Sequence, residues 1–377
     1  MTSWVVRQPS PKNGKKTMQI NPNLFFLTKS QHLIIWNYKT HEQFELDRAH
    51  SQRLLELIYD LSLYNPEFEI DSTFTHHAII QQGAPTLDNL WGWDDLSRIF
   101  HIGTKDLSDA DQPTDGVSWA AHYLAHCQGV MRKSPPDSNR FAHLQSEDFI
   151  SLPQPSPNES LRTYPLLQHT LIKRKTCRTY LNKSISLEDL STLLYLSLGH
   201  LKERLQDTSH LTPPSFRARR SSPSGGGLSS SEGYVYAHNI RGVNPGFYYY
   251  HPDLHALRLI RRIQEPLGNY LNGQHFIDNL PFGIFITSRF DKLWWKYPHS
   301  RAYRVALIEA GHISQTAQLI STAMGLNTWI SSALNDTKIE KALGIQDLKE
   351  QLVLFVGAGY SDGQVFSDEF EKLLRTD

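Results

Sequence analysis

The apolar segment Tyr303–Met324 constrains the fold more than any other part of the chain. It carries few charges and many small residues, and its length and pattern predict one long helix. A helix that is apolar around most of its circumference is buried, and small side chains let the backbone of a partner approach closely. We therefore expect this helix to be packed on several sides. The small residues are Ala306, Ala310, Gly311, Ser314, Ala317 and Ala323.

The segment from about residue 160 to 377 mixes helices with strands. Leu187–Leu198 is predicted to be helical, with Ser186 as its N-cap and Asp189 in the position of a capping box. The predicted strands do not alternate with helices in simple βαβ units, so the expected fold class is α+β. These strands cover Gly233–His238, Gly246–Tyr250, Gly283–Ser288 and Gln351–Gly357.

The segment from about Asn21 to Phe141 is expected to form a smaller module. Strand-like pieces at 24–27, 32–37 and about 44–46 indicate a β-hairpin arrangement. Helices are predicted over Ser51–Leu61 and His77–Gln82. This order of elements favours a winged-helix-like module, which the aromatic-rich stretch after Trp91 would pack onto the rest of the chain.

Prolines concentrate around 133–137 and 152–157, as they do in connections between domains. The boundary is therefore expected near residue 155. This gives an N-terminal module over 1–155, with possible peptide binding, and a second domain over 156–377.

The charge balance excludes several classes of function. Lys and Arg total 38, Asp and Glu also total 38, and a net charge of zero argues against bulk binding to nucleic acid or to an anionic membrane. The N-terminus has no apolar signal region, and no stretch approaches a membrane span. Two cysteines provide no disulfide framework, and the 18 histidines show no metal-ligand spacing. A cytoplasmic protein without a metal is expected.

Three clusters carry candidate chemistry, and the first is the basic run Lys173–Tyr180. Arg174, Lys175 and Arg178 could converge on a phosphate, to which guanidinium groups make charge-assisted hydrogen bonds. Taken alone, the run is more typical of a solvated basic turn.

The second cluster is the serine- and glycine-rich run Arg219–Glu232. Pro223 restricts the turn, and the three glycines let the backbone approach a flat ligand and direct N–H groups towards it. A flexible linker is the alternative. The run matches neither the dinucleotide-binding glycine pattern nor the phosphate loop of nucleoside triphosphatases.

The third cluster contains Lys296 and Tyr297, just ahead of the long helix. An ammonium group close to a phenol favours the phenolate, which would make Tyr297 a usable base. Surface lysine–tyrosine neighbours without any catalytic role are also common.

In order and spacing, these clusters resemble the FMN-dependent nitroreductase superfamily from about residue 170 to 360, and in particular its SagB/McbC-type azoline dehydrogenase branch. Arg174–Tyr180 resembles the arginine-rich start of nitroreductase-type flavoproteins. Ser222–Leu228, continuing to Glu232–Tyr234, resembles the serine–glycine element of the SagB-type enzymes. Further similar segments are Gly246–Pro252, Lys296–Tyr297, Tyr303–Arg304, Glu309–Gln315 and Ala323–Leu326.

This resemblance implies a nitroreductase-like fold, a homodimer with one FMN at each subunit interface, and a role for each matched residue. Lys296 and Tyr297 match the pair assigned to catalysis. An N-terminal module in longer members is thought to hold the leader of the substrate peptide. The resemblance assigns the FMN phosphate and ribityl to Arg174, Lys175 and Arg178, and the flavin ring to Ser222, Pro223, Ser224, Gly226 and Gln315.

The chain departs from the family pattern at a few positions. Lys175 replaces an arginine, Thr176 a serine, and Ser230 a proline. The exit of the last strand, at 356–363, lacks the Arg or Lys that nitroreductases often place near the phosphate. These departures bear on the strength of FMN binding.

The implied reaction is oxidation of a thiazoline or oxazoline ring in a ribosomal peptide to the azole. Tyr297, assisted by Lys296, would remove the Cα proton as hydride passes to the flavin. A cyclodehydratase complex is a possible partner. Two alternatives stay open, an NAD(P)H-dependent nitro- or quinone reductase on the same fold, and a flavin-less scaffold of a peptide-modifying complex.

Overall fold

The computed structural model describes residues 17–29, 32–83, 91–106, 113–131, 165–201, 204, 218–297 and 300–375. Its contacts divide the chain into two compact units. The first comprises 1–91 with 98–103, and the second comprises 92–97 with 104–377. The division falls within helix α3 (Asp95–Gly103), earlier in the chain than the expected boundary near residue 155, which lies outside the described residues.

In the first unit, β2 (Leu24–Lys29), β3 (His32–Asn37) and β4 (Gln43–Leu46) form an antiparallel sheet in that order. Helices α1 (Arg48–Tyr59) and α2 (Glu69–His76) follow. The hairpin strands and the helix predicted over 51–61 are thereby confirmed. The winged-helix assignment stays a prediction.

The helix predicted over His77–Gln82 is wrong. Ala78 adopts a left-handed φ of 51°, which ends α2, and strand β5 (Ile80–Gly83) follows and pairs antiparallel with β1 (Thr17–Ile20). The fully buried side chain of Ile80 belongs to the core of this unit, so tertiary packing selects the strand.

The second unit is built on a six-stranded sheet in which all neighbours are antiparallel. The order is β10 (Asn327–Ser331), β11 (Glu350–Gly359), β9 (Phe282–Arg289), β6 (Ser231–Ala237), β7 (Gly246–His251) and β8 (Ala256–Arg261). The expected α+β class and the predicted strands are confirmed.

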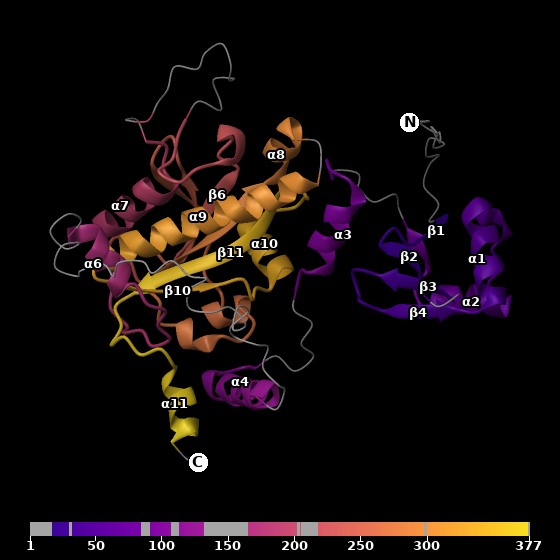
Figure 1. Cartoon of the computed structure of the whole chain (residues 1–377), viewed down its shortest axis with the longest axis horizontal. Helices are drawn as coiled ribbons and strands as arrows, with labels where there is room; N and C mark the ends of the chain where they lie inside the picture. Colours follow the sequence, from indigo (N-terminus) through magenta and orange to yellow (C-terminus); the bar gives the residue numbers. More distant parts are fainter. Residues whose placement is uncertain are drawn as a thin grey trace, which may run out of the picture. The chain divides into compact units, whose positions relative to one another are not determined.

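Helices α7 (Leu187–Leu198) and α9 (Arg301–Ala323) pack against one face of this sheet (Figure 1). The other face carries α10 (Asp336–Leu343) and two short 3₁₀ turns over Leu267–Tyr270 and His275–Ile277. The Ser186 cap of α7 is confirmed by a 3.0 Å bond from the Asp189 amide to Ser186 Oγ.

The remaining described helices of this unit are α4 (Gly116–Met131), α6 (Pro165–Lys173), α8 (Phe290–Lys296) and α11 (Asp368–Leu374). Helix α4 packs with this unit, since Trp119 contacts Phe276 and Tyr123 contacts Phe370. These contacts explain why the unit begins well before residue 155.

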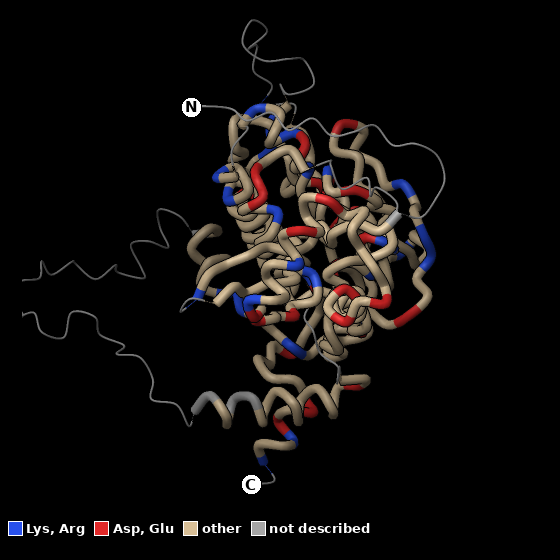
Figure 2. Tube along the Cα trace, turned by 90° about the vertical axis from the view of Figure 1, so that its right-hand side faces the viewer, with Lys and Arg blue, Asp and Glu red and all other residues tan. Residues whose placement is uncertain are grey.

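Burial of α9 is one-sided, unlike the all-round burial that its composition predicted. Ala306, Ala310 and Ile313 face the sheet, whereas Leu307 and Ile308 are 41% and 58% exposed. Lys, Arg, Asp and Glu are interspersed along the described trace in Figure 2. None of the described helices is both long and apolar enough to span a membrane.

Candidate functional site

The serine–glycine turn, residues Ser222–Gly227, lies directly before strand β6. Gly226 and Gly227 adopt left-handed φ angles of 62° and 71°, which L-residues with side chains rarely adopt. No hydrogen bond within the described residues uses the amide of Gly226. Gly226 is exposed, so its N–H group is available to a ligand.

A buried carboxylate on α9 holds this turn. Glu309 is 2% exposed, and its Oε2 accepts from Ser224 Oγ at 2.7 Å and from the Gly225 amide at 3.3 Å. Its Oε1 accepts from the Ser231 amide at 2.9 Å, just after the turn. Charge-assisted bonds of this kind are roughly twice as strong as neutral ones. The turn is therefore fixed on α9 near both of its ends.

A second contact to α9 comes from Ser222, whose hydroxyl lies 2.8 Å from that of Thr316. Ser222 is buried, while Pro223 and Gln315 are exposed. The structure thus places Ser222, Ser224 and Gly226 in one short segment against the helix, with Gln315 on the solvent side of α9.

Lys296 and Tyr297 come from the end of α8 and meet the turn at Gly226. Lys296 Nζ donates to the Gly226 carbonyl at 2.9 Å. A Cβ added at Gly226 would lie 2.4 Å from Tyr297 Oη and 3.0 Å from Lys296 Nζ. The two motifs, 70 residues apart in the chain, are therefore in direct contact.

Aromatic packing fixes the position of this pair. Trp93 Nε1 donates to the Tyr297 carbonyl at 3.0 Å. The Trp93 ring packs at 5.6 Å from Trp294 and at 6.1 Å from Tyr303, both edge-on. Trp93 belongs to the aromatic-rich stretch of the sequence, and its contact to Tyr297 was not foreseen.

The basic segment, residues Arg174–Arg178, follows α6 and borders strand β10. Thr176 forms a parallel bridge with Thr328, and the Cys177 amide donates to the Thr328 carbonyl at 3.1 Å. Thr328 Oγ1 in turn bonds Gln318 Oε1 of α9 at 3.3 Å. Helix α9 therefore supports both the basic segment and the serine–glycine turn.

The three predicted phosphate ligands differ in their surroundings. Arg178 donates through Nη1 to the Val365 carbonyl at 2.8 Å, which ties it to the chain that leaves β11. Arg174 and Lys175 form no ion pair with any carboxylate in the described part of the chain. At this exit from β11 the chain carries Asp362, whose carboxylate accepts a hydrogen bond from Thr179 Oγ1.

These surroundings fit an anionic cofactor. Arg174 and Lys175 are adjacent cations without a carboxylate partner in the described part of the chain, which suits them to a phosphate. The absence of side chains at Gly226 and Gly227 lets Tyr297 and Arg219 approach the turn.

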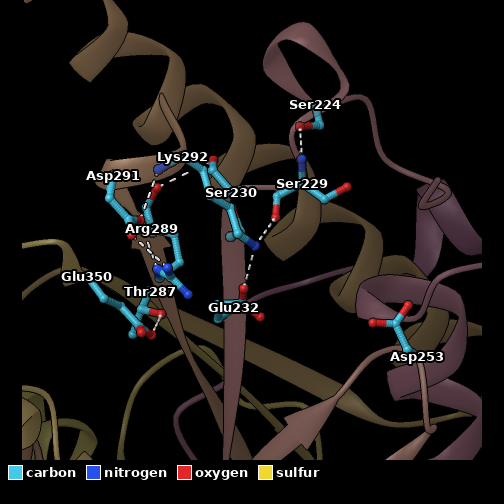
Figure 3. Close-up of polar contacts among 12 residues, drawn as sticks. Ser224, Ser229, Ser230, Glu232, Asp253, Thr287, Arg289, Asp291, Lys292 and Glu350 are labelled. Carbon is cyan, nitrogen blue, oxygen red and sulfur yellow. Dashed lines mark hydrogen bonds and ion pairs between the residues drawn. The ribbon is translucent and has the colours of Figure 1, made fainter. Parts of the chain in front are cut away.

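A polar network that sequence reasoning missed lies behind the turn (Figure 3). Lys292 Nζ pairs with Glu232 at 2.8 Å and reaches the Ser229 carbonyl at 3.3 Å, while the Ser229 amide donates to Ser224 Oγ at 2.7 Å. Glu350 accepts from Thr287 at 2.7 Å, and burial raises the pKa of its carboxyl.

Comparison with known proteins gives the class. Residues 171–360 match the Nitroreductase family, which is half of the chain, and the chain belongs to this family. The resemblance found in the sequence is thereby confirmed at the family level.

Three relatives are similar to this chain. A Methanocaldococcus jannaschii protein named as a nitroreductase is 29% identical over 185 residues, covering 48% of this chain and 85% of its own. Trifolitoxin operon protein TfxC of Rhizobium leguminosarum bv. trifolii is 22% identical over 315 residues, 80% of each chain. Trifolitoxin-processing protein TfxB of the same organism is 27% identical over 150 residues, 38% of this chain and 40% of its own.

Proposed function

We propose that the protein is an FMN-dependent dehydrogenase that oxidises thiazoline or oxazoline rings of a ribosomal peptide to thiazoles or oxazoles. The contact of Lys296 and Tyr297 with Gly226 carries this proposal, because it joins a proton-transfer pair to the turn proposed to hold the cofactor. The similarity to TfxB and TfxC, which are named for trifolitoxin processing and for its operon, supports a peptide-processing role.

The basic segment and the serine–glycine turn would hold the cofactor. The Gly226 amide would face the ring. Ser222 and Ser224, which are held by Thr316 and Glu309 of α9, would fix the position of the turn relative to the ring. When bound, FMN supplies the two-electron acceptor for the oxidation. Arg174, Lys175 and Arg178 would bind its phosphate and ribityl, and Pro223 and Gln315 would complete the surroundings of the ring.

Tyr297 would act as the base that removes the proton from the ring Cα, which is acidified by the neighbouring C=N bond. Lys296 Nζ donates to the Gly226 carbonyl and lies 5.8 Å from the Tyr297 ring centre, so both side chains of the pair lie at the turn. Trp93 fixes the backbone of Tyr297, so the base is positioned before the substrate arrives.

We further propose that the protein is a homodimer. The exposed apolar side chains Leu307 and Ile308 lie beside Gly311, where an added Cβ would meet nothing within 4 Å. Such a face on α9 suits a homodimer interface that brings a second subunit to the flavin site. We further propose a precursor peptide as substrate in the cytoplasm, an N-terminal module within 1–155 that binds its leader, and association with a cyclodehydratase.

The test is conversion of an azoline-containing peptide, followed by mass spectrometry for the loss of two hydrogens per ring. Tyr297→Phe and Lys296→Ala are expected to keep the visible flavin band and to abolish conversion. If both variants convert the peptide at the parental rate, the assigned base is wrong.

A nitro- or quinone reductase is the second candidate, favoured by the similarity to the M. jannaschii protein named as a nitroreductase. Rapid bleaching of the flavin by NAD(P)H, without peptide conversion, would favour it. A purified protein that shows no flavin band even after soaking with FMN would instead favour a scaffold.

A further inference from the structure

Strand β8 is an edge of the six-stranded sheet, and its outer side pairs with nothing in the described part of the chain. The opposite edge differs, because β10 is covered by the bridge from Thr176 to Thr328 and by the Cys177 amide. An open edge presents unpaired N–H and C=O groups that can template another strand. In β8 these groups are accompanied by side chains that are mostly exposed.

The two faces of β8 have different chemistry. Leu257 and Leu259 lie opposite Tyr250 and Tyr248 of β7. These two tyrosines belong to the core beneath α7 and α9. Arg258 and Arg261 pair with Tyr249 and Phe247 on the other face, because a register irregularity next to Phe247 brings both arginines to one side. The strand therefore has one apolar and one basic face. None of the ion pairs in the described residues involves Arg258 or Arg261.

Each face of β8 opens into its own cavity. The apolar-face cavity, of about 430 Å³, lies between α7 and the β7–β8 hairpin. Its histidine is satisfied on both ring nitrogens, by Ser191 at 2.8 Å and by Tyr250 at 2.7 Å. The cavity is lined by Leu190, Leu194, Tyr248, Tyr250, His255 and Leu257, among others. It is suited to an apolar side chain.

The basic-face cavity, of about 500 Å³, extends from Arg258 beneath β7 and β6. It ends at Arg289 and at two carboxylates, Glu232 and Glu350, and its lining also includes Leu259 and Ile260. Glu232 is bound by the same Lys292 that reaches the Ser229 carbonyl beside the serine–glycine turn. Strands β8 and β6 are two strand spacings apart, about 10 Å. The serine–glycine turn lies directly before β6, so this edge and the proposed reaction site belong to the same sheet.

We propose that β8 is the docking edge for the substrate peptide, which adds to the sheet as a further strand with alternating apolar and acidic side chains. Successive side chains of a strand point to opposite faces, so the apolar ones enter the apolar-face cavity and the acidic ones meet Arg258 and Arg261. Opposite charges directly across a ladder stabilise it and like charges weaken it, which sets the preference for acidic residues. The identity of this peptide as the substrate rests on the proposed function, whereas the strand addition does not.

The test uses the full chain and two fluorescein-labelled peptides, one alternating Leu with Glu and one alternating Leu with Lys. Fluorescence anisotropy is expected to show about tenfold tighter binding of the Leu/Glu peptide. The double variant Arg258→Glu with Arg261→Glu is expected to reverse that preference. A reversal cannot come from a merely misfolded variant. The matched control is Lys29→Glu with Lys39→Glu, two exposed lysines of the first unit, and it is expected to bind like the parent.

Equal binding of both peptides by parent and arginine variant would overturn the proposal. A loss of peptide binding in the lysine control alone would also overturn it, because it would place the peptide on the first unit. The proposal would also be overturned if neither peptide bound and sedimentation showed that the parent is a dimer while the arginine variant is a monomer. That result would show that β8 pairs two copies of the chain. The arginine variant is expected to keep its flavin band and to oxidise a short azoline at the parental rate. Peptide binding by a protein that never takes up flavin would refute the proposed oxidation and leave the docking edge standing.

Discussion

The carboxylate of Glu309 accepts a hydrogen bond from Ser224 Oγ at 2.7 Å, and it does so while only 2% exposed. The same carboxylate also binds the amides of Gly225 and Ser231. A single side chain of the long helix therefore fixes the turn that is proposed to hold the flavin.

Glu309→Gln is expected to destabilise the protein and to loosen this turn. The glutamine side chain has only one acceptor oxygen. Either the backbone N–H of Ser231, or the Ser224 hydroxyl together with the Gly225 N–H, would therefore face an NH₂ group. Loss of charge-assisted bonds in a buried site costs about 3 kcal/mol of unfolding free energy. Urea unfolding followed by circular dichroism measures this loss.

The control is Glu188→Gln, at an exposed position in the first turn of α7. It removes only a helix-dipole interaction, of roughly 0.3–1 kcal/mol. Equal losses in the two variants would show that Glu309 does not hold the turn.

Gly226→Ala is expected to reduce turnover at least tenfold while the protein stays folded. The left-handed φ of 62° costs a residue with a side chain roughly 1–2 kcal/mol. The new methyl group would also lie 2.4 Å from Tyr297 Oη, so the proposed base must move. Gly129→Ala is the matched control, because a Cβ there meets nothing within 4 Å. Parental turnover in Gly226→Ala would remove the contact between base and turn from the mechanism.

Periodicity sufficed to predict the elements that carry the site. The helix over Leu187–Leu198 and the strand from Gly233 follow from local pattern and capping, and both are present. The helix expected over His77–Gln82 failed because the buried contact of Ile80 is non-local. Local propensity alone cannot weigh such a contact.

The supporting residues of the site were beyond prediction for the same reason. Glu309 was visible only as one residue of a helix segment that resembles the family, and nothing nearby in sequence marks Ser224 as its partner 85 residues away. Tyr234 and Glu350 are bonded at 2.9 Å across 116 residues. Lys296 and Tyr297 were found because they are adjacent in the chain, but their contact with Gly226 needed the fold.

Arg174→Ala is expected to weaken FMN binding about tenfold to a hundredfold, because a charge-assisted hydrogen bond to phosphate is lost. The expectation depends on Arg174 having no carboxylate partner in the described residues, so that its charge is available to a ligand. Quenching of FMN fluorescence on titration measures the affinity. Lys173→Ala, at the exposed end of α6, is the control and is expected to bind FMN like the parent. Similar affinities for both variants and the parent would exclude Arg174 from the phosphate site.

As the pH rises from about 4 to about 6, the free energy of unfolding is expected to fall because of Asp336. Burial raises the pKa of this carboxyl from 3.8 to about 6, against the opposing hydrogen bond from the Asp106 amide. The folded protein therefore holds a proton that the unfolded chain releases in this range, and the slope of stability against pH is negative. The total loss is about 3 kcal/mol, complete above the folded pKa.

Asp336→Asn tests this assignment, because the amide cannot ionise and its oxygen still accepts from the Asp106 amide. At pH 4 the parent carboxyl is largely neutral, so parent and variant are expected to unfold at similar urea concentrations. At pH 7 the variant is expected to be more stable by about 2 kcal/mol, since the buried charge is gone and a smaller helix-dipole interaction at the start of α10 is lost with it. Comparing the two proteins at each pH cancels the contribution of titrating groups that do not interact with Asp336, including the buried Glu350. Two curves that run parallel from pH 4 to pH 7 would mean that Asp336 titrates alike in the folded and unfolded chain.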